Sequence, residues 1–206
     1  MARRPDVLEH TILGVLAEGP LHGYELRKRL TAILGPFRAL SFGSLYPCLH
    51  RLTDRGLVEQ AHDRAEVVVT SKRARVVYSI TADGKEAFAD WVADDGPDAW
   101  EDEAFAARLA FFSRTDAQVR LRILEGRRAR LEERLRTLQD SIERTNERMD
   151  IYAERLQLHG IEGAEREVHW LEDLISTERG ARQAKRRARA AKKAARSATR
   201  NREERT

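Results

Sequence analysis

The chain has 206 residues, 35% of them charged, a mean hydropathy of −0.61 and a net charge of +4. No apolar run approaches the roughly 20 residues that cross a bilayer, which excludes a membrane protein, and the first residues lack the apolar core of a signal peptide. The single cysteine, Cys48, rules out an intrachain disulfide and fits a reducing cytoplasm. The length suits one ordinary domain, or a small domain with an appendage.

The net charge hides an uneven distribution. Residues 179–206 contain 12 Lys/Arg and 2 Asp/Glu, whereas the rest of the chain contains 26 and 32. The last segment is therefore at +10 and the remainder at −6. Because the positive net charge comes from the last segment, it is no evidence that the folded part binds nucleic acid. That evidence has to come from where individual charges lie in the folded part.

Three short helices are predicted before residue 57. In each of them apolar residues recur three and four positions apart, which is the spacing of one buried helix face. Asp6 followed by Glu9 fits a capping box for the first helix, and Gly19-Pro20, Gly35-Pro36 and Gly56 supply the breaks. The buried faces are Leu8, Ile12, Val15 and Leu16, then Leu26, Leu30, Ile33 and Leu34, then Leu45, Leu49 and Leu52.

The third of these helices, within residues 41–56, has a second face that is polar and cationic. Hydroxyl, imidazole and guanidinium groups of this kind meet phosphates and base edges, which indicates a DNA recognition helix. A cap at Ser44 would place Pro47 in the first turn, whereas a cap at Ser41 would place it deeper and predict a kink. The candidate DNA contacts on this helix are Ser41, Ser44, Tyr46, Pro47, His50 and Arg51.

A β-hairpin is predicted after the third helix, with strands at 57–59 and 76–80 and 67–70 as a possible extension of the first. Lys72, Arg73 and Arg75 would form its basic tip, either contacting phosphates or simply solvated. Three helices followed by a hairpin is the order of a winged helix-turn-helix. With a further helix over 81–92, residues 1–95 are expected to form a DNA-binding domain.

Residues 98–178 are expected to form a helical dimerisation domain. Leucines recur with a heptad period over about 36 residues, from Leu121 to Leu156, and such a long helix needs a partner. That partner is either a shorter helix after a break at Gly160 and Gly163 or, more economically, a second chain, because two-fold DNA readers address two half-sites. The candidate dimerisation residues are Phe105, Leu109, Leu121, Leu124, Leu131, Leu135, Leu138 and Ile142.

The last segment, residues 179–206, is rich in Ala, Lys and Arg and holds no large apolar residue beyond 180. It is expected to be disordered in isolation, or helical only when its charge is neutralised. It would follow DNA phosphates, bind an anionic membrane surface or act as a solubilising tail.

Several motifs together resemble the PadR family of bacterial transcriptional regulators, with a C-terminal part similar to the longer, virulence-activator-like subfamily. The resemblance implies a winged-helix homodimer on an inverted-repeat operator, usually a repressor, released in some members by a small aromatic compound. Tyr46, Arg51 and the basic residues before Tyr78 match its DNA-facing positions. The extra run at 65–69, Cys48 and the basic tail depart from the pattern. The matching motifs are Gly19-Pro20-Leu21-His22-Gly23-Tyr24, Gly43-Ser44-Leu45-Tyr46-Pro47 and Tyr78-Ser79-Ile80-Thr81.

The predicted fold is mainly α with a small β-hairpin: a winged helix-turn-helix, a coiled-coil-like dimerisation domain and a basic disordered tail. The predicted function is sequence-specific DNA binding in the cytoplasm, at the nucleoid when bound. The alternative is a helical scaffold whose winged-helix domain contacts proteins. No catalytic, cofactor or metal motif is present in the sequence. Cys48 is read as a small buried residue rather than a redox switch.

Overall fold

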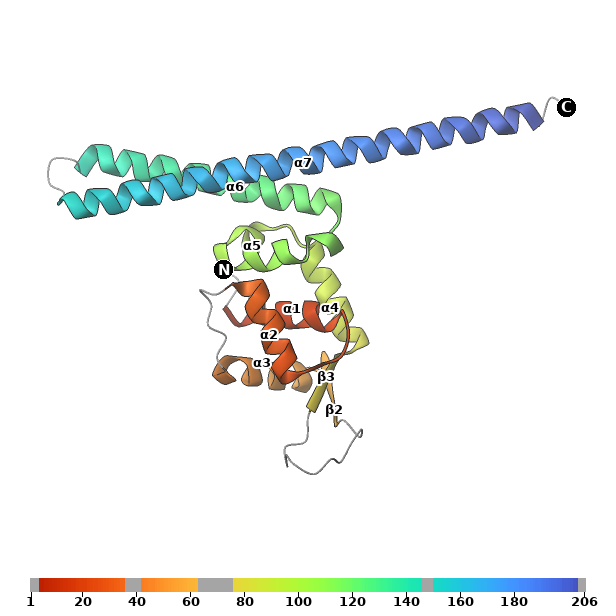
Figure 1. Ribbon diagram of the computed structural model, residues 1–206, viewed down its shortest axis with the longest axis horizontal. Coiled ribbons are helices and arrows are strands. Elements are labelled where there is room, and N and C mark those ends of the chain that lie inside the picture. The colour runs from red at the N-terminus through yellow and green to blue at the C-terminus, as the bar shows by residue number, and fades with distance from the viewer. Residues whose placement is uncertain (1–3, 36–41, 63–75, 146–149, 204–206) are drawn as a thin grey trace. The chain divides into compact units, whose positions relative to one another are not determined.

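The computed structural model describes residues 4–35, 42–62, 76–145 and 150–203 (Figure 1). The chain forms two compact units, Met1–Val119 and Arg120–Thr206, which are described one at a time. Mostly helical secondary structure with one small antiparallel sheet matches the predicted fold class.

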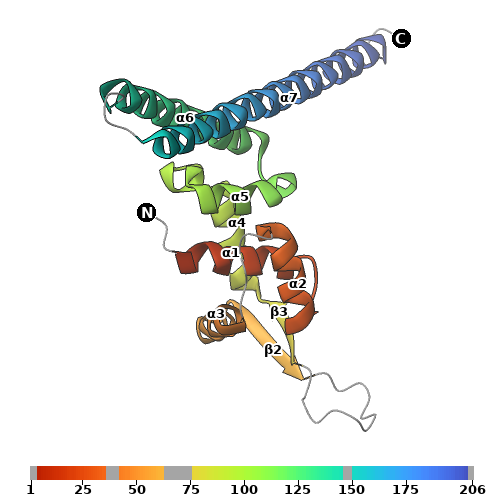
Figure 2. The ribbon, with the colours of Figure 1, turned by 60° about the vertical axis from the view of Figure 1, so that its left-hand side comes forward.

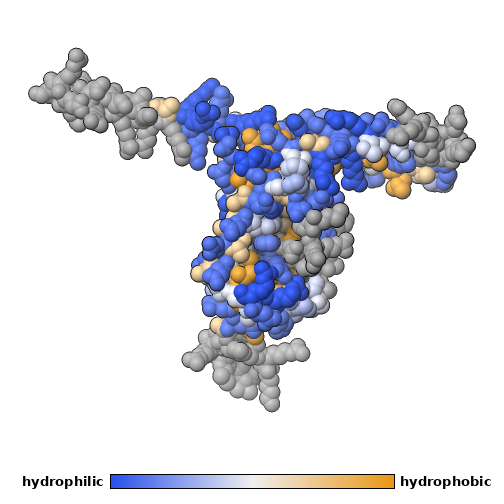
Figure 3. Space-filling model, turned by 180° about the vertical axis from the view of Figure 1, so that it is seen from behind, coloured by the Kyte–Doolittle hydropathy of each residue, from blue (hydrophilic) through white to orange (hydrophobic). Residues whose placement is uncertain are grey.

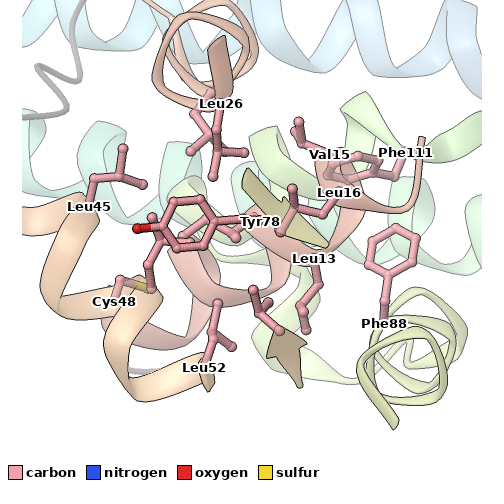
Figure 4. Close-up of a cluster of buried hydrophobic side chains, with 14 of the residues drawn as sticks. Leu13, Val15, Leu16, Leu26, Leu45, Cys48, Leu52, Tyr78, Phe88 and Phe111 are labelled. Carbon is pink, nitrogen blue, oxygen red and sulfur yellow. The ribbon is translucent and has the colours of Figure 1, made fainter. Parts of the chain in front are cut away.

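The first unit is built on three helices, α1 (Arg4–Leu16), α2 (Gly23–Leu34) and α3 (Phe42–Asp54). Their apolar faces meet in one core together with side chains from the sheet and from later helices (Figure 4). The predicted buried faces are therefore largely correct. The capping box at Asp6 is not: α1 already begins at Arg4, so Asp6 lies inside the helix. The core residues with less than 2% exposure are Ile12, Leu13, Val15, Leu16, Leu26, Leu30, Leu45, Cys48, Leu49, Leu52 and Val58.

The sheet has three strands in the order β1-β3-β2. Strands β2 (Val58–His62) and β3 (Val76–Ile80) pair antiparallel, with Val58 opposite Ile80, which confirms the predicted hairpin. Strand β1 (Leu21–His22) was not predicted, and it pairs with β3 through Tyr78 and Val77. Helix α3 lies beside β2 (Figure 2).

Helix α4 (Ala82–Ala93) is tied to the end of α3 by its N-cap residue, Thr81. The Thr81 hydroxyl accepts a bond from the Gly84 backbone N–H at 3.1 Å and donates to the Gly56 carbonyl at 2.7 Å. Gly84 is buried against the chain after α3, since a Cβ there would lie 2.1 Å from the Leu57 carbonyl oxygen. A larger residue at this position would therefore force the backbone to shift.

The first unit extends beyond the expected domain boundary at residues 95–98. A short 3-10 turn (Pro97–Trp100), α5 (Asp102–Ala110) and a second turn (Phe112–Arg114) belong to it. The buried guanidinium of Arg108 on α5 donates to the Trp91 carbonyl, to the Asp94 carbonyl at 2.6 Å and to Asp94 Oδ2 at 2.9 Å. These bonds hold α5 against the end of α4, which is consistent with α5 belonging to the first unit.

The second unit holds most of α6 (Ala117–Thr145) and all of α7 (Ile151–Glu203). Ion pairs join the two helices, among them Arg120–Glu178 at 2.7 Å, Arg127–Glu167 at 2.8 Å and Glu125–Arg179 at 2.6 Å. Arg120, near the start of α6, pairs with a later residue of α7 than Arg127 does, so the two helices run antiparallel.

Three expectations for this unit need correction. The heptad helix does not run on to Leu156, because α6 ends at Thr145 and α7 begins at Ile151. No break occurs at Gly160 or Gly163, which lie inside α7. The basic tail is helical through Glu203, consistent with alanine having the highest helix propensity of all residues.

Candidate nucleic-acid interface

Helix α3 has one fully buried and one exposed face, as its sequence predicts. Leu45, Cys48, Leu49 and Leu52 have at most 1% exposure, and they pack into the core of the first unit (Figure 4). The opposite face is exposed, and it holds Ser44, Tyr46, Pro47, His50 and Arg51. Because one face is packed in the core, the position of the exposed face is fixed, which suits binding in a DNA groove.

The start of α3 decides between the two expected caps. The helix begins at Phe42, so Ser44 is inside it rather than capping it. Pro47 is accordingly an interior residue and, having no N–H, gives no helical bond to the Gly43 carbonyl. Ser41 lies outside the described residues.

Arg51 is held by Glu9, which was predicted to belong to a capping box. Glu9 on α1 is only 6% exposed, and its Oε1 accepts from Arg51 Nε at 3.0 Å while its Oε2 accepts from Arg55 at 2.7 Å. The two arginines are about half exposed. Glu9 thus fixes the direction of one cation on α3, Arg51, and of one just after its end, Arg55. One signal in the sequence was available: Glu9 precedes Ile12, Leu13 and Leu16 by three, four and seven residues, on the buried face.

Tyr46 links α3 to the start of α2. A Cβ at Gly23 would lie 3.1 Å from the Tyr46 hydroxyl and 3.6 Å from two ring carbons. The glycine therefore lets the ring pack closely against α2, which gives the His-Gly-Tyr and Leu-Tyr-Pro motifs a joint structural reason. Burial, with a smaller contribution from Tyr46, raises the pKa of Tyr78 on β3. Tyr46 itself stays 37% exposed.

Cys48 lies on the buried face and has no exposed surface. Burial, reinforced by the nearby Glu9 charge, raises the pKa of its thiol to about 12. The thiol is therefore neutral at physiological pH, and since the thiolate is the reactive form, Cys48 fits the structural role rather than a redox switch.

Strand β2 is fastened to α3 by a side-chain hydrogen bond. Gln60 Nε2 on β2 donates to Thr53 Oγ1 on α3 at 3.3 Å. Lys72, Arg73 and Arg75, the predicted basic tip, lie outside the described residues, as does the 65–69 run.

The structure divides the candidate dimerisation residues by burial. Phe105, Leu124 and Leu131 are buried within one chain, whereas Leu109, Leu121, Leu135 and Leu138 are partly exposed. The side chain of Ile142 is outside the described set. Several apolar side chains on α7 are exposed, among them Tyr152 and Leu156 of the predicted heptad pattern. The exposed fractions lie between 41% and 81% for Ile151, Tyr152, Leu156, Leu158 and Trp170. Figure 3 shows such apolar areas among the hydrophilic surface.

Within the described ranges, no group of three or more His, Cys, Asp or Glu side chains is arranged to hold a metal ion. The described helices also include none that is both long and apolar enough to span a bilayer.

Residues 12–90 match the model of the Transcriptional regulator PadR-like family. A negative transcriptional regulator, PadR of Bacillus subtilis, is 31% identical over 86 residues, which are 42% of this chain and 45% of that protein. The chain thus aligns with a little under half of this relative's length.

Solved structures give further likenesses. B. subtilis PadR in complex with operator DNA is 26% identical, with 84% of this chain and 99% of that chain covered and a TM-score of 0.39. A putative transcriptional regulator from Thermoplasma acidophilum is 32% identical over 42% of this chain and 77% of its own, with a TM-score of 0.35.

Proposed function

Since residues 12–90 form a domain of the PadR-like family of transcriptional regulators, we propose that the chain is a homodimeric repressor that binds an inverted-repeat operator. The family consists of regulators, so the chemistry to account for is recognition rather than catalysis. The proposal places the protein in the cytoplasm, at the nucleoid when bound to DNA.

The exposed face of α3 carries the proposal. Its polar side chains stand on a helix whose other face is buried in the core, so they can enter a major groove without rearranging the fold. Ser44, His50 and Arg51 supply donors and acceptors for base edges and phosphates. Tyr46 and Pro47 add apolar contact area. Ser41, Lys72, Arg73 and Arg75, which lie outside the described residues, are proposed as further phosphate contacts from the sequence alone.

Repression is proposed because the B. subtilis relative is named a negative regulator. Blocking a promoter requires no chemistry beyond tight and specific binding. Relief by a small aromatic ligand is part of the proposal only through the family resemblance, and direct titration of aromatic acids against the DNA complex tests it separately.

The homodimer is proposed from the apolar side chains left exposed on α7. Tyr152 is 81% exposed and Leu156 is 72% exposed, and their four-residue separation puts them on one side of the helix. Neighbouring exposed apolar side chains of this kind are a feature of protein interaction sites. A second copy of the chain is the partner that would also double α3 for two half-sites.

Selection of bound sequences from random duplex DNA by the full-length chain tests the function. The expected result is an enriched motif made of two inverted half-sites whose centres lie about one helical turn apart. Arg51→Ala and His50→Ala should each reduce the discrimination between that motif and a scrambled duplex, by roughly 1–3 kcal/mol if the side chain reads a base.

The matched control is Lys85→Ala, which removes an exposed cation on α4 rather than α3 and should leave discrimination unchanged. Equal losses on the motif and the scrambled duplex would make the α3 residue a phosphate contact. Failure to enrich any motif would overturn the proposed function and favour the scaffold alternative.

A further inference from the structure

The second half of α7 is a continuous helix of opposite charge to its first half. Between Ile151 and Glu178 the helix holds two Arg and seven Asp/Glu, whereas residues 179–206 hold 12 Lys/Arg and 2 Asp/Glu. The change of sign falls between Glu178 and Arg179, both of which are paired with α6. A cationic helix therefore begins where the pairing of α6 with α7 ends.

The cations beyond this point are not neutralised by the fold. Among the tail residues whose side chains the structure describes, Arg182, Lys185, Arg186 and Arg187 form no ion pair with any described residue. By contrast, Arg120 and Arg127 on α6, and Arg179 at the start of the basic segment, each pair with a glutamate on the facing helix. The basic segment thus has a large uncompensated charge that an anionic partner would neutralise.

Most of the basic positions form a stripe. On the α-helix that continues to Glu203, three- and four-residue spacings put eight of them on one side, and a row of alanines occupies the other, together with Arg187 and Arg202. Alanine offers little apolar area to a protein partner, whereas a line of cations matches a line of phosphates. The stripe consists of positions 182, 185, 186, 189, 192, 193, 196 and 200, and the alanine row of 181, 184, 188, 191, 195 and 198.

We propose that this segment, Arg179–Glu203, is a second DNA-binding element that contacts the phosphates of double-stranded DNA without reading sequence. At about 1.5 Å per residue the segment is roughly 38 Å long, close to one turn of duplex. It adds affinity for any duplex and leaves the choice of operator to α3. The inference extends the proposed function, because a regulator that first binds DNA non-specifically finds its operator by sliding along it.

The salt dependence of binding tests the proposal in the full-length chain. Replacing Arg182, Lys185, Arg186 and Arg189 by Gln should make the slope of log K against log salt concentration less steep by up to about 3.6, at about 0.9 per lost phosphate contact. The change should appear equally on a selected operator and on a scrambled duplex. Circular dichroism checks that the helix persists.

The matched control replaces four exposed arginines of α6, Arg122, Arg130, Arg134 and Arg136, by Gln. It removes the same charge and should leave the slope close to that of the unmodified chain. An unchanged slope in the tail variant, or the same change in both variants, would overturn the proposal.

The same variants distinguish DNA from other partners of the tail, and failure of the tail proposal from failure of the proposed function. Loss of binding by the tail variant only to single-stranded RNA, only to phosphatidylglycerol vesicles or only to a second copy in sedimentation would each overturn DNA as the partner. If the unmodified chain prefers no duplex sequence but its slope still exceeds that of the tail variant, the regulatory function fails and the tail proposal stands.

Discussion

Glu9 shows how one buried side chain holds α3 in place. Its carboxylate is 6% exposed and accepts from Arg51 and Arg55, which reach it from 42 and 46 residues away. Glu9→Gln should lower the free energy of unfolding by about 1–3 kcal/mol, because two charge-assisted bonds at a buried site are weakened. Urea denaturation measures the change.

The chain offers a control for Glu9 in Glu18, whose ion pair with Arg29 at 3.0 Å is about half exposed on both sides. Glu18→Gln should change the stability by about 0–1 kcal/mol, as exposed pairs do. If both variants unfolded at the same urea concentration as the unmodified chain, Glu9 would have no part in holding α3.

The burial of Cys48 should make the stability of the fold depend on pH. Its pKa in the folded chain, about 12, lies above the ordinary value of 9.0. The buried neutral thiol therefore stabilises the fold fully below about pH 9, and this contribution is lost as the pH rises toward 12. Native protein at pH 8 should react with a thiol reagent far more slowly than urea-unfolded protein. Rapid labelling of the native chain would contradict the burial of this thiol.

At the scale of the elements, replacing a helical glycine by alanine should have opposite effects on stability at two positions. Gly84→Ala on α4 would place a Cβ 2.1 Å from the Leu57 carbonyl, so the backbone must shift, and we expect a loss of roughly 2 kcal/mol or more. Gly160→Ala on α7 meets nothing within 4 Å, so the better helix propensity of alanine should stabilise that helix by about 1 kcal/mol. Thermal melts followed by circular dichroism compare the two, and a loss at Gly160 would show a contact there.

The elements also show which features sequence can predict. The faces of α3 and the β2–β3 hairpin follow from short-range periodicity, so Leu45, Leu49 and Leu52 were identified correctly. Strand β1 is two residues long and exists only through its pairing with β3, which no local pattern reveals. The inward role of Glu9 depends on partners more than 40 residues away. The tail combines like charges, whose repulsion favours disorder, with alanines, which favour a helix. The prediction of disorder followed the charges, whereas the segment is helical.

At the scale of the whole molecule, the exposed apolar residues of α7 predict self-association. Leu156→Asp places a charge at a side chain that is 72% exposed, so it should leave the fold of one chain intact while making a dimer contact unfavourable. Sedimentation of the full-length chain at micromolar concentration should show a dimer for the unmodified protein and a monomer for the variant.

Glu154→Lys is the control for that experiment, because it changes a charge two residues from both Tyr152 and Leu156, on the other side of α7. It should sediment as a dimer. A dimer would also set the symmetry of the DNA site: the Leu156→Asp chain should select a single half-site, where the unmodified chain should select two inverted ones. A monomeric unmodified chain would remove the dimer from the proposal, and a variant that stays dimeric would move the contact away from this face of α7.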